Sequence, residues 1–211
     1  MELKYRKWSE LPVGVFKKLI GTTTEEMDAI DTEIRIISIL CDCDEEDILE
    51  LSIPEYQRLR GEAQWIANRP KSKAFCPQTV KLENQYEISY DISKITAAQY
   101  IDFQSYVKLN DTNKYLSNIL AIFFIPKGKK YGEVDPQIII NDIDKNLNME
   151  MAESMCFFFT TQFVSLTKNF LLYLESDLKK KIKVSKGQDR IKLMEELGKI
   201  HSQINGIGSI K

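Results

Sequence analysis

Residues 149–183, MEMAESMCFFFTTQFVSLTKNFLLYLESDLKKKIK, decide the fold that we predict for this chain. Apolar side chains recur there at alternating steps of three and four, which is the period of one face of an α-helix. The stripe consists of Ala152, Met155, Phe159, Gln162 or Phe163, Leu166, Phe170 and Tyr173. Phe157 and Phe158 widen it, so we expect one long helix that is buried on more than one side. This helix is predicted to be the centre of the fold or part of a subunit interface.

The same stretch does not predict a membrane-spanning helix. Polar residues interrupt it at Thr160, Thr161, Gln162, Ser165, Thr167, Lys168 and Asn169. A helix in the hydrocarbon core of a bilayer does not tolerate so many polar groups near its middle. The first ten residues carry several charges and lack the apolar region of a secretory signal peptide. We therefore expect a protein that is made in the cytosol and stays soluble.

Composition places the chain among ordinary globular proteins. It has 211 residues, of which 43% are hydrophobic and 28% charged, so it can bury a real core. The formal net charge of −2 provides no overall positive field that would hold nucleic acid, although local basic patches remain possible. The four cysteines include no Cys-x-x-Cys pair, and Cys41 and Cys43 are too close in sequence to favour a disulfide or a zinc site. Free thiols in a reducing compartment are expected.

The first 68 residues predict a module of short helices. A first helix lies between Pro12 and Gly21, and a second follows Thr23 and Glu26, which have the spacing of a capping box. The acidic residues 44–47 begin a third helix, where carboxylates suit the helix dipole. Ser52 and Glu55 form a second capping box with Pro54 just inside the helix.

Residues 69–73 are predicted to be a connector, and β-type residues follow it. Residues 79–83 and 86–92 flank Asn84 and Gln85, and the second run alternates apolar with polar residues. We predict a small β-hairpin there, although Asn-Gln is a weak turn pair.

Helices resume at Thr96, which has capping-box spacing with Gln99. A further helix carries the apolar residues from Leu116 to Phe123 and must end before Pro126. After the basic loop 126–132, residues 137–147 predict a short helix, with a strand at 138–140 as the alternative. Asn148 is placed to cap the long helix.

The predicted fold class is mainly α: a helical domain with one small β-hairpin and a long central C-terminal helix. A last amphipathic helix is expected over residues 189–204. The predicted organisation is a helical module over 1–68, a hairpin and helical region over 69–204 that packs on the helix at 149–183, and a flexible tail over 205–211.

No residue set predicts a catalytic or metal site. His201 is the sole histidine, which excludes a histidine-based triad and a metal site built from several histidines, so we interpret it as a surface or interface residue. The acidic and thiol groups at 41–47 lack the spacing of a calcium loop. Nucleotide-binding and nucleophile-elbow glycine motifs are absent from the sequence. We therefore expect no enzyme activity and no cofactor.

Two lysine clusters and one aromatic run remain as candidate contacts. Lys127, Lys129 and Lys130 in the basic loop, and the lysines of 179–183, are expected to be solvated surface, or else a contact with nucleic acid or an acidic partner. The run Phe157-Phe158-Phe159 is more consistent with a core or an interface than with a stacking platform for bases.

Several segments resemble proteins of tailed phages. The segments 8–12 (WSELP), 36–40 (IISIL), 47–51 (DILEL) and 56–59 (YQRL) resemble a helical module of tail assembly chaperones. The segments 95–102 (ITAAQYID) and 124–131 (FIPKGKKY) resemble virion-gene products of Bacteroidetes phages, including crAss-like phages.

This resemblance implies a protein that helps to build or complete a phage particle by contact with other virion proteins and with copies of itself. It would act in the host cytoplasm during assembly and then in the virion. For the contacts we select Phe157, Phe158 and Phe170 on the long helix and Lys127, Lys129 and Lys130 in the basic loop. Two alternatives stay open: a tail assembly chaperone that is absent from the particle, and a nucleic-acid-binding regulatory protein that uses the lysine clusters. No membrane and no small-molecule substrate are expected as partners.

Overall fold

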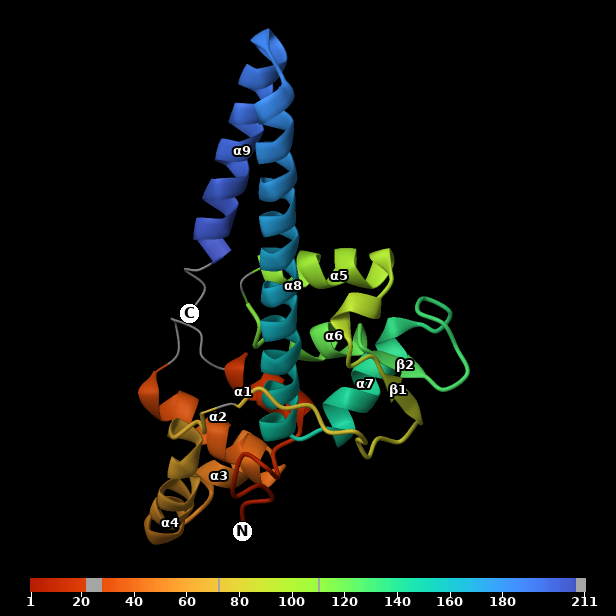
Figure 1. Cartoon of the computed structure of the whole chain (residues 1–211). Coiled ribbons are helices and arrows are strands. Elements are labelled where there is room, and N and C mark those ends of the chain that lie inside the picture. Colours follow the sequence, from red (N-terminus) through yellow and green to blue (C-terminus); the bar gives the residue numbers. More distant parts are fainter. Residues whose placement is uncertain (22–27, 72, 110, 208–211) are drawn as a thin grey trace. The chain divides into compact units, whose positions relative to one another are not determined.

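Helices make up most of the described chain, and a single two-stranded antiparallel sheet accompanies them (Figure 1). The structure is a computed structural model that describes residues 1–21, 28–71, 73–109 and 111–207. Two compact units divide the chain: Met1–Phe158, here called unit 1, and Phe159–Lys211, called unit 2. The predicted fold class, mainly α with a long C-terminal helix, is confirmed.

Unit 1 begins with four helices: α1 (Val13–Ile20), α2 (Ala29–Cys41), α3 (Glu45–Leu49) and α4 (Ile53–Ala63), and a 3₁₀ turn (Gln64–Ala67) follows. Asp28 caps α2 by accepting from the N–H of Ile30 at 2.9 Å. The predicted capping box at residues 23 and 26 lies outside the described residues.

The second predicted capping box is wrong. Ser52 does occupy the N-cap position of α4, but its side chain makes no capping hydrogen bond. Glu55 accepts instead from the amine of Met1 at 3.1 Å. Spacing predicts which residue starts the helix, but other donors compete for the carboxylate.

The second half of unit 1 holds β1 (Tyr86–Ile88), a 3₁₀ turn (Ile92–Lys94), α5 (Ala97–Lys108), α6 (Leu116–Ala121), β2 (Phe124–Pro126) and α7 (Pro136–Asn146). The capping box at the start of α5 is confirmed: the N–H of Thr96 donates to the Gln99 side chain at 3.0 Å, and the N–H of Gln99 donates to the Thr96 hydroxyl at 3.3 Å. Helix α7 confirms the helix predicted at 137–147 and rules out the strand alternative.

The predicted β-hairpin is wrong in its pairing. Strand β1 lies antiparallel to β2, with Tyr86 opposite Pro126 and Ile88 opposite Phe124, whereas residues 79–83 form no strand. The strand is also shorter than predicted, because Ile92 belongs to a 3₁₀ turn. The N–H groups of Glu83 and Asn84 point to a carboxylate rather than to a neighbouring strand.

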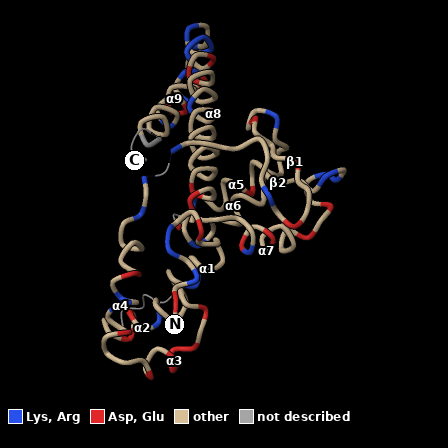
Figure 2. Tube along the Cα trace, turned by 90° about the horizontal axis from the view of Figure 1, so that it is seen from below, with Lys and Arg blue, Asp and Glu red and all other residues tan. Residues whose placement is uncertain are grey.

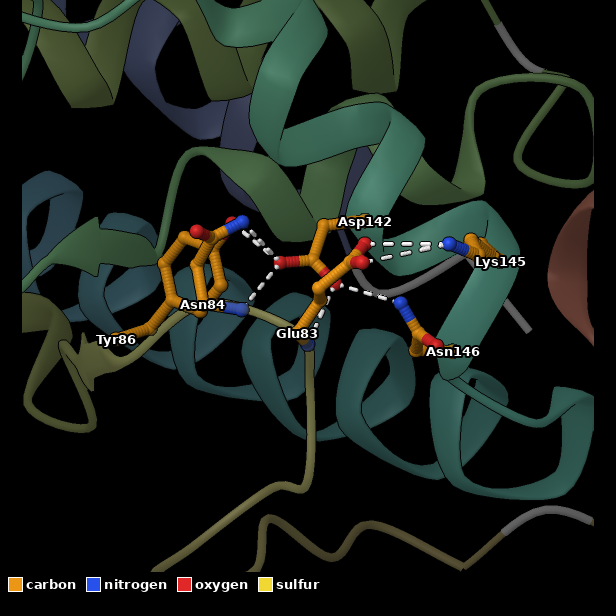
Figure 3. Close-up of polar contacts among 6 residues, drawn as sticks. All are labelled: Glu83, Asn84, Tyr86, Asp142, Lys145 and Asn146. Carbon is orange, nitrogen blue, oxygen red and sulfur yellow. Dashed lines mark hydrogen bonds and ion pairs between the residues drawn. The ribbon is translucent and has the colours of Figure 1, made fainter.

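That carboxylate belongs to Asp142 on α7, which is buried with 4% of its surface exposed (Figure 3). It accepts from the backbone N–H groups of Glu83 and Asn84 at 2.9 Å, from the Asn84 amide at 2.8 Å, from the Tyr86 hydroxyl at 2.9 Å and from the Asn146 amide at 2.8 Å. Burial by itself would raise the pKa of Asp142, but these hydrogen bonds lower it to about 2. The charged carboxylate therefore fixes the segment before β1 onto α7.

The other side of α7 packs closely on α1. A Cβ atom added at Gly14 would lie 3.0 Å from the backbone oxygen of Asp144, so the two helix backbones meet where only glycine fits. Lys17 of α1 pairs with the Asp144 carboxylate at 2.9 Å. Around this contact, the N–H of Val13 donates to Leu147 at 3.0 Å and the N–H of Met149 donates to Leu11 at 2.7 Å. The start of the chain is thus tied to the start of the long helix.

The long helix α8 (Met149–Val184) confirms the prediction for 149–183. Asn148 caps it as expected, because its side chain accepts from the N–H of Met151 at 2.9 Å. The part of α8 that belongs to unit 1 contributes to the core of this unit, where Ala152 and Met155 are completely buried.

Unit 2 contains the rest of α8 and the antiparallel helix α9 (Gly187–Ile207), which packs along it (Figure 1). We call this pair, over residues 159–207, the α8–α9 hairpin. The described helix α9 runs to Ile207, beyond the predicted end at residue 204, so the predicted flexible tail is helical over 205–207, and residues 208–211 lie outside the description. Within the described residues, no helix is long and apolar enough to cross a membrane.

Replacement of Asp142 by Asn should lower the free energy of unfolding by about 3 kcal/mol at pH 7, because an amide cannot accept all of these donors. Urea denaturation followed by circular dichroism measures this change. Glu83→Gln is the matched control, because the ion pair of Glu83 with Lys145 is exposed; it should cost less than about 0.5 kcal/mol. Equal effects of the two substitutions would contradict the structural role of Asp142.

The same carboxylate makes stability depend on acid pH. Because its pKa is lower in the folded protein than its ordinary value of 3.8, its contribution is complete above pH 5 and is lost as the pH falls through 3.8 toward 2. We expect it to account for about 2 kcal/mol of the loss of stability over that range. Asp142→Asn should lack this component when unfolding free energies are compared at pH 5 and pH 2.5.

Gly14→Ala should destabilise unit 1 by about 1–3 kcal/mol, since the new methyl group must push α1 away from α7. Gly61→Ala is the matched control: Gly61 lies in α4 with nothing within 4 Å of an added Cβ, so alanine should be neutral or stabilise by up to about 1 kcal/mol. Thermal unfolding of both variants checks the pair. If Gly14→Ala were as stable as the wild type, the close approach of α1 to α7 would not be required for stability.

Candidate functional site

The basic loop, residues 126–132, leaves β2 and carries three exposed lysines, Lys127, Lys129 and Lys130 (Figure 2). Two glycines in the left-handed region shape it: Gly128 has φ 74° and Gly132 has φ 85°. The N–H of Lys127 donates to Gln85 at 3.0 Å, and the N–H of Lys130 donates to the Glu133 carboxylate at 3.0 Å. The backbone of the loop is therefore held by hydrogen bonds, and its three lysines are exposed, as the sequence predicted.

A cavity of about 330 Å³ opens beside this loop, between α5, α6, β2 and α7. Its wall is largely apolar. The apolar lining residues are Ala121, Ile122, Ile125, Pro126, Val134, Pro136, Ile139 and Ile140. A cavity of this size and lining accommodates an apolar group of a ligand or of a partner side chain.

The polar groups at the cavity are bonded to one another. The Tyr131 hydroxyl donates to Asp102 at 2.6 Å, and the Asn118 amide lies 3.4 Å from the Tyr106 hydroxyl. Burial, followed by the hydrogen bond to Asp102, raises the pKa of Tyr131, so the phenol stays protonated. All four of these residues line the cavity. Sequence analysis missed the cavity because its lining comes from separate elements.

The aromatic residues selected for contacts lie on α8. In unit 1, Phe157 is 50% exposed and Phe158 is half-buried. In unit 2, Phe170 is 57% exposed, and Tyr173, three residues further along the same face, is 68% exposed. Exposed aromatic residues therefore occur on both parts of α8, so the apolar stripe is buried over only part of its length.

The remaining apolar residues of the α8–α9 hairpin divide into two sets. Leu171 and Leu178, two turns apart on α8, are buried. Leu193, Leu197 and Ile200 on α9 are half-buried at helical spacing, which is the pattern expected of the face that meets α8. The large exposed apolar residues are Phe170, Leu172, Tyr173, Val184, Ile191 and Met194.

His201 lies on the surface of α9, where its Nε2 is 2.9 Å from the Glu175 carboxylate of α8. Glu175 also pairs with Lys179, and the hydrogen bonds from Lys179 and then from His201 lower the pKa of this carboxyl group. The histidine therefore contributes to the contact between the two helices of unit 2.

Two carboxylates of the acidic stretch at 42–47 make local contacts that stabilise the fold. Asp42 pairs with Lys4 at 2.6 Å, and the Asp47 carboxylate accepts from the N–H of Asp44 at 3.1 Å at the start of α3. Within the described ranges, no group of three or more His, Cys, Asp or Glu side chains is arranged to hold a metal ion.

Arg69, in the predicted connector, makes a contact that the sequence did not indicate. Its guanidinium pairs with Glu153 of α8, which is nearly buried, and lies 5.1 Å from the Phe16 ring centroid and 5.9 Å from that of Trp8. Burial lowers the pKa of Arg69, although a guanidinium stays charged at any physiological pH. The connector is thus anchored on α1 and on the first turns of α8.

All four cysteines are free thiols. Burial raises the pKa of Cys76 to about 12. Burial, and then the charge of Cys43, raises the pKa of Cys41 to about 11. Because the thiolate is the reactive form, neither residue has the electrostatic environment of a nucleophile.

Comparison of the chain with protein-family models, with curated proteins and with solved structures gives no match.

The thiols provide a direct test of these environments. In a variant that retains Cys76 and has the other three cysteines replaced by alanine, alkylation by iodoacetamide at pH 8 should be at least about 100-fold slower in the native protein than in guanidinium, because burial suppresses the thiolate. Mass spectrometry of samples quenched over time measures both rates. Equal rates would contradict the burial of Cys76.

Proposed function

We propose that this chain is a non-enzymatic assembly protein of a tailed phage particle, which acts through contacts with other virion proteins and with copies of itself. It would do so in the host cytoplasm during assembly and then within the virion. The resemblance of several segments to phage virion proteins and tail assembly chaperones supports a role in the assembly of a phage particle.

One structural observation carries the proposal: the α8–α9 hairpin leaves large apolar side chains in solvent on both of its helices. Phe170 and Tyr173 lie on one face of α8, and Ile191 and Met194 lie on α9, all of them more than half exposed. Phe170 and Tyr173 are neighbours on α8, and neighbouring exposed apolar side chains are typical of interaction surfaces. Their burial at roughly 25 cal/mol per Å² would favour association.

A second copy of the hairpin is the partner that fits this surface. Two helices share only one face, and the buried Leu171 and Leu178 of α8 have the spacing expected of that face. Two hairpins that combine into four helices can bury the outer apolar residues of both copies, as four-helix bundles do. A two-fold arrangement would place the same residues on both sides of the interface.

The basic loop would supply the contact with a different virion protein. Lys127, Lys129 and Lys130 are exposed on a loop whose backbone is held by hydrogen bonds, so an acidic surface could meet them without ordering the loop first. The apolar cavity beside Lys130 would accept a side chain of the same partner.

Light scattering of the purified full chain over a concentration series tests self-association. The wild type should form a discrete oligomer, and Phe170→Ser combined with Tyr173→Ser should shift it toward the monomer by at least about 30-fold in the dissociation constant, since buried aromatic anchors dominate such interfaces. Phe75→Ser is the matched control, because Phe75 in unit 1 is 54% exposed and should leave the mass unchanged.

A wild-type protein that stays monomeric at every concentration would overturn self-association through this surface. A double variant that keeps the wild-type mass would show that the oligomer uses another face. Mass spectrometry of purified phage particles then separates a structural component, which is present, from an assembly chaperone, which is absent.

A further inference from the structure

A strongly basic surface lies where α8 ends and α9 begins, in the region that we call the tip, residues 179–192 (Figure 2). The tip holds seven lysine and arginine residues and one acidic residue, Asp189. All seven cationic residues are exposed. They are Lys179, Lys180, Lys181, Lys183, Lys186, Arg190 and Lys192.

Carboxylates of α8 neutralise only two of these cations. Lys179 pairs with Glu175, and Lys181 pairs with Asp177 at 2.8 Å. In the described part of the chain, the other five cations of the tip form no ion pair.

The helix dipole accounts for part of this arrangement. Lysines in the last turns of α8 are favoured by the partial negative charge of a helix C-terminus. Lys186 and Arg190 flank the first turn of α9, where the helix dipole disfavours positive charge. The pair Lys179–Lys183 also has i,i+4 spacing on α8, at which like charges repel. Lys186 and Arg190 therefore do not stabilise the folded hairpin. A bound polyanion would relieve the repulsion among the cations of the tip.

We infer that the tip of the α8–α9 hairpin binds the phosphate backbone of duplex nucleic acid without sequence specificity. Exposed lysine and arginine side chains at this density are the groups that neutralise successive phosphates. The tip contains no aromatic residue, so it lacks the stacking platform with which proteins hold single strands.

An anionic membrane fits the tip less well. Val184, 81% exposed, and Ile191, 59% exposed, are the exposed large apolar residues of the tip, whereas surface-binding helices insert a row of bulky apolar side chains. The cationic residues of the tip are different residues from the exposed apolar ones, so the substitutions that test the inference leave Phe170, Tyr173, Ile191 and Met194 unchanged.

Fluorescence anisotropy of a labelled 30-base-pair DNA of random sequence, titrated with the full chain, tests the inference. With about five phosphate contacts, the slope of log K against log salt concentration should be about −4.5, so affinity should fall roughly 500-fold between 50 and 200 mM NaCl. The triple variant Lys180→Glu, Lys183→Glu, Lys186→Glu should lose at least about 100-fold in affinity at 50 mM NaCl and have a shallower slope.

The matched control is the triple variant Lys127→Glu, Lys129→Glu, Lys130→Glu in the basic loop. Each triple variant lowers the formal net charge by six, from −2 to −8, so overall charge alone cannot separate them. The loop variant should lose less than about 5-fold. Because glutamate at the end of α8 opposes the helix dipole, a second tip variant with Lys→Gln at the same three positions keeps the helix and should still lose at least about 10-fold.

Three outcomes would overturn the inference. The first is no binding of the duplex at 50 mM NaCl, and the second is equal loss of affinity in the tip and loop variants. The third is binding of the wild type to vesicles that contain phosphatidylserine, or to polyglutamate, without binding to the duplex, which would identify the tip as a contact for a membrane or an acidic protein. Circular dichroism spectra that match the wild type confirm that the variants are folded.

Discussion

The buried carboxylate of Asp142 is the interaction on which unit 1 depends. A charge that is removed from water is stable only if donors surround it, and here a backbone segment more than fifty residues earlier in the chain supplies them. The network holds that segment on α7, and this in turn allows β1 to pair with β2. Helix α7 also meets α1 at Gly14, and its residues Ile139 and Ile140 form a wall of the cavity beside the basic loop. The geometry of the cavity therefore follows from how one helix is anchored on both sides.

The apolar residues of α8 have the same helical spacing along its length, but they are buried to different extents in the two units. Its first turns, with Ala152 and Met155, lie in the core of unit 1. In unit 2, α9 is the helix that packs along α8, and Phe170 and Tyr173 remain more than half exposed. A pair of helices has one common face, so a stripe wider than that face must meet solvent or a partner. This constraint supports association as the role of unit 2, while the basic tip provides a surface of different chemistry on the same hairpin.

Most helices could be predicted from the sequence because their signals are local. The period of the apolar residues, the box of Thr96 and Gln99 and the cap at Asn148 each involve residues within one or two turns. The basic loop was predicted from its proline, glycine and lysine residues for the same reason. The prediction of the β-hairpin was wrong because residues 83 and 84 bind the carboxylate of Asp142, which is distant from them in sequence. No local pattern indicates that the N–H groups of Glu83 and Asn84 will find this acceptor.

The sequence by itself determined most of the helices, the caps of α5 and α8 and the clustering of lysines, because each of these is a property of neighbouring residues. The tertiary structure alone decided which strand pairs with β1, that Arg69 anchors the connector on α1 and α8, and that a cavity forms next to Lys130. It also decided which residues of the apolar stripe on α8 are buried. Burial and long-range hydrogen bonds depend on what other segments bring to the same place, and that information is spread over the whole chain.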